Sequence, residues 1–138
     1  AYLPVRRERS VAKGESAAKR ARLEAIAKEA CEQSGRNRLL NILPPLSFVD
    51  FLDFSRDFPV KIYAYEEVGA AGGLRKIASG LKDSPVLVLI GPEGGIAPNE
   101  ARLLDEAGFT AVGLGPRILR TETAPLYVMS VLAYETEL

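Results

Sequence analysis

Two glycine-bearing segments carry the residue types in this chain that could hold a ligand. The first is residues 91–95, Gly-Pro-Glu-Gly-Gly, and the second is residues 113–124, which contains Gly113, Gly115 and Arg120. Because glycine has no side chain, a ligand can approach the backbone closely at such a loop. Tight turns alone would also explain glycines at these positions.

Neither segment has the pattern of a nucleotide-phosphate site. The first is not followed by the Gly-Lys-Ser/Thr of a P-loop. In the second, Ile118 stands where the dinucleotide fingerprint has its third glycine, and no acidic residue follows at the expected distance. The sequence therefore gives no support to a doubly wound enzyme that holds a nucleotide by its phosphates.

Histidine is absent from the chain, and cysteine occurs once, at Cys31. The absence of histidine removes the commonest general base and the commonest metal ligand, together with serine–histidine and cysteine–histidine nucleophile pairs. Zinc chemistry and triad hydrolysis are therefore not expected, and no metal is predicted. A single cysteine cannot form an internal disulfide, which fits a reducing compartment.

The composition is that of one ordinary globular domain, with 138 residues of which 47% are hydrophobic and 26% charged. No apolar run reaches the length of about 18 residues that indicates a membrane-spanning helix, and the N-terminus lacks the apolar core of a signal peptide. A cytoplasmic location without membrane partners is expected. The chain does not begin with Met and is expected to be a piece of a longer protein.

The first glycine segment follows Val86–Ile90, an unbroken apolar run. Such a run predicts a strand buried on both faces, at the centre of a parallel sheet. In open α/β sheets ligands bind beyond the carboxyl ends of the strands, where residues 91–95 and 113–124 would lie. Strands that alternate with helices predict a single α/β domain, residues 1–138, with a parallel sheet flanked by helices.

The remaining elements follow from periodicity, caps and turn residues. Helices are predicted at Ser16–Ser34 with Gly35 as the stop, at Ser47–Phe54 with Ser47 as N-cap, at Leu74–Ala78, from Pro98 to Gly108, and at Thr123–Thr136. Strands are predicted at Leu39–Leu43, Val60–Tyr65 and Thr110–Leu114. On the first helix, the residues spaced to share one apolar face are Leu23, Ile26, Ala27, Ala30 and Cys31.

The last predicted helix is apolar almost all round, since Ser130 is the one polar residue between Leu126 and Tyr134. A helix of this kind must be covered on every side. One face against its own sheet and another against a second subunit would achieve this, which predicts a homodimer. A helix at the centre of the core is the alternative.

Charge is unevenly distributed, although the formal net charge is zero. Residues 1–38 contain ten Lys and Arg against five Asp and Glu, whereas residues 39–138 contain eight against thirteen. A basic N-terminal region could contact the phosphates of a nucleic acid. A solvated helix face would explain the same charges.

The two glycine segments closely resemble the two signature motifs of the RsmE family, a group of SPOUT-class RNA methyltransferases. The first motif is Leu89–Gly95 together with Glu100, and the second, which is longer and more specific, is Leu114–Ala124. Residues 9–13 and 32–36 are similar to weaker motifs of that family. The resemblance thus extends over essentially the whole chain.

This resemblance implies an S-adenosyl-L-methionine-dependent enzyme that methylates N3 of a specific uridine in small-subunit (16S) ribosomal RNA, as naked RNA or in an assembled subunit. It also implies an α/β fold with a C-terminal trefoil knot that holds the cofactor, and two subunits packed across the knot. Ordinary topology rules would have rejected a knot. The family's N-terminal PUA-like RNA-binding domain has no counterpart in this chain, and Ala97 stands where the family usually has a Ser or Thr helix cap.

Carried over motif by motif, the resemblance implies a cofactor cleft with two walls and an edge. The implied cofactor-binding residues are Gly91, Glu93, Gly94 and Gly95 in one wall, Leu114, Gly115, Ile118, Leu119, Arg120, Thr121 and Ala124 in the other, and Tyr65 and Glu66 at the edge.

Arg120 is the candidate catalytic residue, a cation that stabilises the charge developing on the uracil oxygens. Glu93 and Glu122 are candidate proton acceptors, although loop hydrogen bonding and helix capping would also explain them. The candidates for contact with RNA phosphates are Arg6, Arg7, Arg9, Lys13 and Arg36. Two other functions stay open: a SPOUT methyltransferase acting on ribose 2′-O or guanine N1, and a non-catalytic RNA-binding module.

Overall fold

The computed structural model describes residues 1–6, 17–71, 73–81 and 84–137. The chain forms two compact units, which divide in the short helix α2 (Phe48–Phe54): the first ends at Phe51 and the second runs from Leu52 to the C-terminus. None of the helices in the described ranges combines the length and the apolar composition needed to cross a membrane.

The first unit contains a small parallel pairing and one long helix. Strand β1 (Val5–Arg6) pairs in parallel with β2 (Leu46–Ser47). The strand predicted at Leu39–Leu43 is wrong in extent, because Ile42 makes only an isolated bridge, with Tyr2. Pro44 and Pro45 have no N–H to donate, so the ladder breaks there and resumes at β2.

Helix α1 (Ala17–Gln33) confirms the first predicted helix, although Ser16 lies outside the described residues. Its end is capped as predicted: Gly35 has a φ of 65°, and the Arg36 amide donates to the Cys31 carbonyl at 3.0 Å. The predicted apolar face is too wide. Ala27 and Cys31 are buried and Leu23 is half-buried, whereas Ile26 and Ala30 are exposed.

The N-terminus of α2 has the predicted cap. The Ser47 hydroxyl oxygen accepts from the Asp50 amide at 3.1 Å, and the hydroxyl donates to an Asp50 carboxylate oxygen at 2.6 Å. The bond from the Asp50 amide satisfies one of the N–H groups that a helix N-terminus leaves without an intrahelical partner. A 3₁₀ turn at Ser55–Asp57 then leads the chain into the second unit's sheet.

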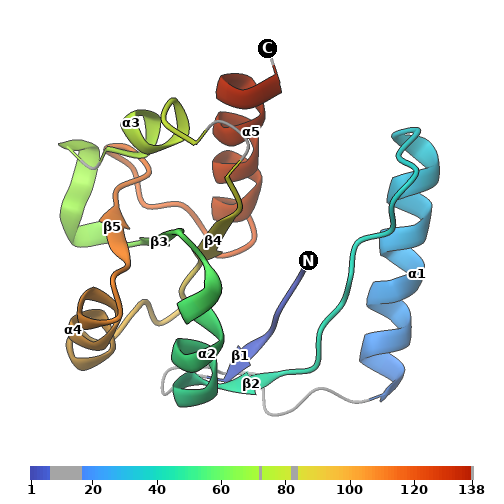
Figure 1. The fold of residues 1–138 in the computed structure, drawn as a ribbon, viewed down its shortest axis with the longest axis horizontal. Coiled ribbons are helices and arrows are strands. Elements are labelled where there is room, and N and C mark those ends of the chain that lie inside the picture. Colours follow the sequence, from blue (N-terminus) through green and yellow to red (C-terminus); the bar gives the residue numbers. More distant parts are fainter. Residues whose placement is uncertain (7–16, 72, 82–83, 138) are drawn as a thin grey trace. The chain divides into compact units, whose positions relative to one another are not determined.

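The second unit is built on a three-stranded parallel sheet in the order β4, β3, β5 (Figure 1). Its strands are β3 (Val60–Ala64), β4 (Val86–Leu89) and β5 (Thr110–Val112). The prediction that Val86–Ile90 forms the central strand is wrong, because β3 is central and β4 lies at the edge of the described sheet. An apolar run indicates that both faces of a strand are covered by other elements. It does not determine whether the strand has hydrogen-bonded neighbours on one edge or on both.

Alternation along β3 directs its side chains to two separate helical layers. Ile62 packs with Leu74 of α3 (Leu74–Ala78) and with Val128 and Leu132 of α5 (Ala124–Glu137) in one buried cluster. The next residue, Tyr63, points to the opposite face. Helices therefore flank both faces of the parallel sheet, as the sequence predicts.

Tyr63 joins the sheet to helix α4 (Pro98–Glu106) on that opposite face. Its hydroxyl donates to an Asp105 carboxylate oxygen at 2.9 Å, and the ammonium of Lys61, two residues earlier, donates to the Ala107 carbonyl at 2.6 Å. Burial and the hydrogen bond to Asp105 raise the pKa of the Tyr63 hydroxyl well above its usual value. Two polar contacts thus fix the C-terminal end of α4 on the sheet.

The raised pKa of Tyr63 predicts that the second unit loses stability in alkali. Tyrosine in an unfolded chain ionises near pH 10, whereas folded Tyr63 keeps its proton, so this group lowers the free energy of unfolding by about 1.4 kcal/mol between about pH 9 and pH 11. Tyr63→Phe should remove that component and cost about 1 kcal/mol at neutral pH for the lost hydrogen bond. Urea unfolding of both proteins at the two pH values measures this; an identical alkaline loss in both would contradict it.

Candidate functional site

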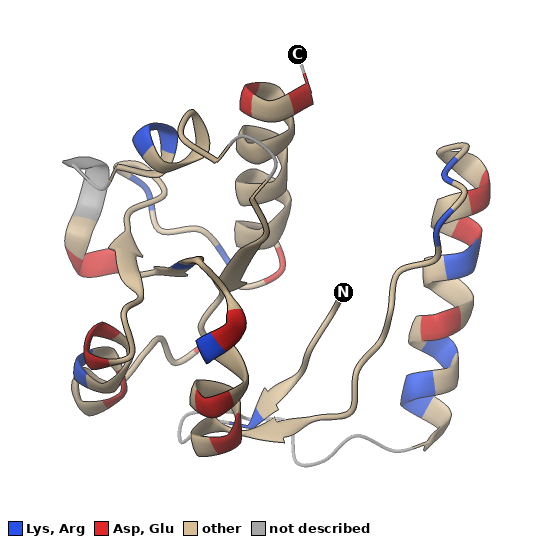
Figure 2. Ribbon diagram, viewed as in Figure 1, with Lys and Arg blue, Asp and Glu red and all other residues tan. Residues whose placement is uncertain are grey.

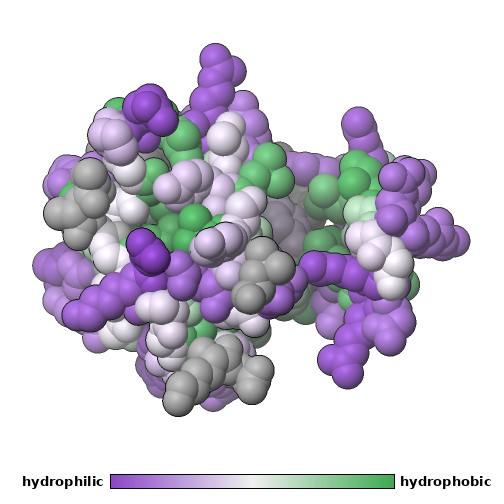
Figure 3. Space-filling model, turned by 90° about the horizontal axis from the view of Figure 1, so that it is seen from above, coloured by the Kyte–Doolittle hydropathy of each residue, from purple (hydrophilic) through white to green (hydrophobic). Residues whose placement is uncertain are grey.

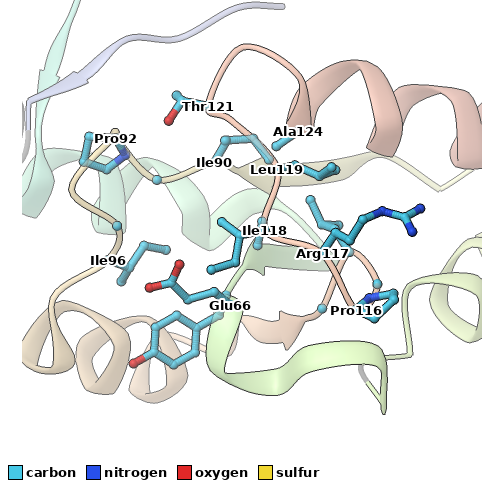
Figure 4. A pocket seen from close by; sticks show the side chains of 17 residues that line it. Glu66, Ile90, Pro92, Ile96, Pro116, Arg117, Ile118, Leu119, Thr121 and Ala124 are labelled. Atoms are coloured by element: carbon cyan, nitrogen blue, oxygen red, sulfur yellow. The ribbon is translucent and has the colours of Figure 1, made fainter.

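One cavity of the second unit lies at the carboxyl ends of all three strands (Figure 4). Residues that follow β3, β4 and β5 line it, and the first residue of α5 closes it. The lining consists of Ala64, Tyr65, Glu66, Ile90, Gly91, Pro92, Gly95, Ile96, Gly113, Leu114, Gly115, Pro116, Arg117, Ile118, Leu119, Thr121 and Ala124. This is the position in which parallel α/β sheets bind ligands.

The structure brings ten of the predicted cofactor-binding residues together around this cavity. They are Tyr65, Glu66, Gly91, Gly95, Leu114, Gly115, Ile118, Leu119, Thr121 and Ala124. The predicted residues Glu93, Gly94, Arg120 and Glu122 are exposed and do not line the cavity. The guanidinium of Arg120 lies 3.9 Å from the Glu122 carboxylate, with both side chains largely in solvent.

The loop after β4 owes its shape to its glycines. The Gly95 amide donates to the Pro92 carbonyl at 2.8 Å, which closes a tight turn. Gly95 has a φ of 72°, a value that residues with a side chain rarely adopt. At Gly91 a Cβ would stand 3.0 Å from Ile96 Cγ1. A glycine at each position therefore keeps the wall of the cavity free of extra atoms.

The loop after β5 leads directly into α5. Gly115 has a φ of 107°, a conformation reserved for glycine. The Arg120 carbonyl accepts from the amides of Thr123 and Ala124, both at 2.9 Å, and so anchors the first turn of the helix. The last predicted helix, Thr123–Thr136, is confirmed as α5, which begins at Ala124, one residue later than expected.

The cavity wall is amphipathic. Isoleucine and leucine side chains make up much of it, while the polar groups are the Glu66 carboxylate, the Thr121 hydroxyl and the Arg117 guanidinium (Figure 4). The ring of Tyr65 packs against Tyr63, with centroids 5.7 Å apart. Such a lining suits a molecule with an apolar ring at one end and charged or hydroxyl groups at the other.

Sequence reasoning missed several residues of the wall: Ala64, Ile90, Pro92, Ile96, Gly113, Pro116 and Arg117. Each of the seven is next in the sequence to a predicted residue, so whole segments were predicted better than single positions. Ile96 had its own signal, since an apolar residue directly after Gly95 has no reason to stand in a solvated turn. It is buried, with 6% of its surface exposed.

The loop after β4 ends at a buried carboxylate. Glu100 is 4% exposed, and it accepts from the Ala97 amide at 3.0 Å. This is one half of a capping box; the other half is missing because the alanine side chain has no acceptor. The departure from a Ser or Thr cap noted in the sequence therefore falls on the first turn of α4.

The predicted RNA-contacting residues belong to the first unit or lie outside the described residues. Arg6 and Arg36 are exposed, whereas Arg7, Arg9 and Lys13 are not described. Both basic and acidic residues occur along α1 (Figure 2), and the pairs Arg20–Glu24 and Lys28–Glu32 are 3.0 and 3.8 Å apart. Within the described ranges, no three acidic or cysteine side chains gather in a way that could hold a metal ion.

Gly115→Ala is expected to destabilise the second unit by about 1–3 kcal/mol, because its φ is forbidden to alanine even though no atom lies within 4 Å of the added Cβ. Hydrogen exchange should accelerate in residues 113–121. Gly35→Ala is the matched control, since Gly35 also has a positive φ and open space around it. Its effect should be confined to the end of α1; unchanged exchange at 113–121 in Gly115→Ala would contradict the assignment.

Comparison with known proteins identifies the family. Residues 1–133 match the model of the RNA methyltransferase domain. Ribosomal RNA small subunit methyltransferase E of Bacillus subtilis (strain 168) is 43% identical over the whole chain, which spans 57% of that protein. The chain thus covers little more than half the length of this relative.

Solved structures agree with this match. A Legionella pneumophila protein described as a methyltransferase and solved with the cofactor SAM has a TM-score of 0.82 and 30% identity, over 97% of this chain and 55% of that one. A ribosomal RNA small subunit methyltransferase E from Neisseria gonorrhoeae, bound to S-adenosyl methionine, has a TM-score of 0.73 and 35% identity, over 97% and 54%. This chain therefore belongs to the RNA methyltransferase domain family, and within it to the RsmE family.

Proposed function

We propose that this domain binds S-adenosyl-L-methionine in the cavity and methylates N3 of a uridine in small-subunit ribosomal RNA. One observation carries the proposal: two loops singled out separately in the sequence line a single cavity at the carboxyl ends of parallel strands. The names of the relatives support the ribosomal RNA substrate, and the ligands of the two similar structures support the cofactor. As the substrate is ribosomal, we place its action in the cytoplasm.

The residues present fit such a cofactor. The apolar side chains of Ile90, Ile96 and Leu119 suit an adenine ring. The Arg117 guanidinium and the Thr121 hydroxyl suit an amino acid and a ribose, and Glu66 adds one negative charge to the wall. S-adenosylmethionine supplies a methyl group on a sulfonium, so transfer requires neither a metal nor a covalent intermediate with the chain. What the chain contributes is placement, which can be worth an effective concentration of about 10⁵–10⁸ M.

Arg120 is the residue that we propose stabilises the negative charge developing on the uracil oxygens. Its backbone joins the cavity-lining residues Leu119 and Thr121, and its side chain is 86% exposed, so it is accessible to a large substrate. Glu93 and Glu122, both exposed on the same two loops, are the proposed alternatives for the proton acceptor. Glu122 has a competing role, since its carboxylate lies 3.9 Å from the Arg120 guanidinium.

Calorimetric titration with S-adenosylmethionine tests the cofactor, and transfer of a labelled methyl group to small ribosomal particles by the full-length protein tests the reaction. Nucleoside analysis should find 3-methyluridine. A 2′-O-methyl nucleoside or 1-methylguanosine would instead give the other SPOUT specificities. RNA binding without any cofactor binding would indicate a non-catalytic module.

Arg120→Ala is expected to lower the rate of methyl transfer by about 10²-fold, the effect of removing one preorganised charge-stabilising group, while the cofactor dissociation constant stays the same. Arg102→Ala is the control, because Arg102 is an exposed arginine on α4 paired with Glu106 at 2.6 Å. Single-turnover rates and calorimetry separate the two quantities. Full transfer activity in Arg120→Ala would overturn its role.

The basic residues of the N-terminal region are proposed to contact RNA phosphates. Arg6→Glu and Arg36→Glu should each weaken RNA binding and reduce the slope of log affinity against log salt by about 1, because one neutralised phosphate fewer releases about one counterion fewer. Arg56→Glu makes the same change of net charge in the second unit, where Arg56 is paired with Asp53 at 2.8 Å. Equal losses of affinity in all three variants would mean that total charge, rather than these positions, governs binding.

A homodimer is proposed through the outer face of α5. Leu126, Met129 and Tyr134 are 70%, 57% and 67% exposed. Figure 3 shows that hydrophobic residues reach the surface between hydrophilic ones. A trefoil knot in residues 86–124 is proposed as well, because the loops after β4 and β5 close around one cavity. Tracing the chain in an experimental density map tests the knot.

Met129→Asp is expected to convert the dimer to a monomer, since a carboxylate would be buried without a partner at the interface. Val49→Asp is the matched control, because Val49 is 69% exposed on α2. Light scattering of the three proteins gives their masses. A monomeric wild type, or a dimeric Met129→Asp, would exclude this interface.

A further inference from the structure

Glu66 is the only acidic residue among the described residues that line the cavity, and Arg117 is the only basic one. Glu66 directly follows β3 and begins the 3₁₀ segment Glu66–Ala71, at the carboxyl edge of the central strand. Its carboxylate lies against the loop after β4, where a Cβ on Gly95 would be 3.5 Å from Glu66 Oε1. One negative charge therefore stands in the wall formed by two of the three strand ends.

This negative charge has no partner within the described part of the chain. No salt bridge joins Glu66 to a lysine or arginine there, and in Figure 4 the Arg117 side chain extends away from the Glu66 carboxylate. The rest of the lining consists of glycine, proline, apolar residues, Tyr65 and Thr121. The Glu66 side chain is exposed, so water solvates its charge until a ligand covers it. A ligand that displaces this water is favoured if it carries a positive charge beside the carboxylate.

The methyl donor and its product differ in this charge. A sulfonium carries one positive charge, whereas the thioether that remains after methyl transfer is neutral at sulfur. All other groups of the two molecules are the same. A wall charge that is not cancelled by the chain can therefore distinguish two ligands of otherwise identical shape.

We propose that Glu66 is the specificity-determining residue that makes the cavity bind the positively charged methyl donor in preference to the neutral product. This inference rests on the proposed function of the cavity and adds to it a device for product release. Loss of the methyl group removes the charge that Glu66 attracts, so the reaction itself weakens the binding of what remains. No movement of a loop is needed for this effect.

The test uses the full chain and three probes: S-adenosylmethionine, S-adenosylhomocysteine and sinefungin, which has a protonated amine in place of the sulfonium. Glu66→Gln keeps the size of the side chain and removes its charge. We expect it to weaken the two cationic probes by about tenfold and the neutral one by less than about twofold. Glu67→Gln is the matched control, since Glu67 is the neighbouring carboxylate, is exposed as Glu66 is, and does not line the cavity.

Calorimetry on the three proteins gives the affinities, and thermal unfolding confirms that each variant is folded. Equal losses for all three probes in Glu66→Gln would mean that the carboxylate binds a shared group, such as the ribose hydroxyls, and would overturn the inference alone. Unchanged affinities, or equal effects of Glu66→Gln and Glu67→Gln, would do the same. A wild-type protein that binds none of the probes would overturn the proposed function together with the inference.

Discussion

Parallel pairing on both edges of β3 is the constraint on which the rest of the second unit depends. Because β4 and β5 run parallel to β3, their carboxyl ends meet at one edge, and the three loops that follow must lie side by side. Alternation along the same strand sends Ile62 to one helical layer and Tyr63 to the other. A five-residue strand thus determines both the layering of the fold and the position of the cavity.

The sequence was sufficient for the helices whose boundary signals are local. Pro98 in the first turn and Gly108 after the end delimit α4, and Gly35 ends α1, each through a backbone conformation that the residue type dictates. Which strand is central could not be predicted in this way. Whether a strand is hydrogen-bonded on both edges depends on residues far apart in the chain. The apolar content of residues 86–90 indicates only that the two faces of that strand are covered.

The sequence predicted the loops that form the cavity, but not which of their side chains face it. Glycine positions and the resemblance led to ten of its residues, but the side chains of Glu93, Arg120 and Glu122 point to solvent although their neighbours line the wall. In an irregular loop no fixed period relates sequence position to direction, so a motif identifies the segment and the fold decides which of its side chains face inward. Residues 7–16, with three of the predicted RNA contacts, lie outside the described residues.

The Arg120 carbonyl accepts from two successive amides at the start of α5. These bonds connect the loop that lines the cavity directly to the first turn of that helix. Leu119 and Thr121 stand in the cavity wall, and Ala124 is at once a wall residue and the first residue of the helix. Part of the cavity wall and the first turn of α5 are therefore one continuous, hydrogen-bonded piece of backbone. A substitution that shifts the first turn of α5 would therefore also shift residues of the cavity wall.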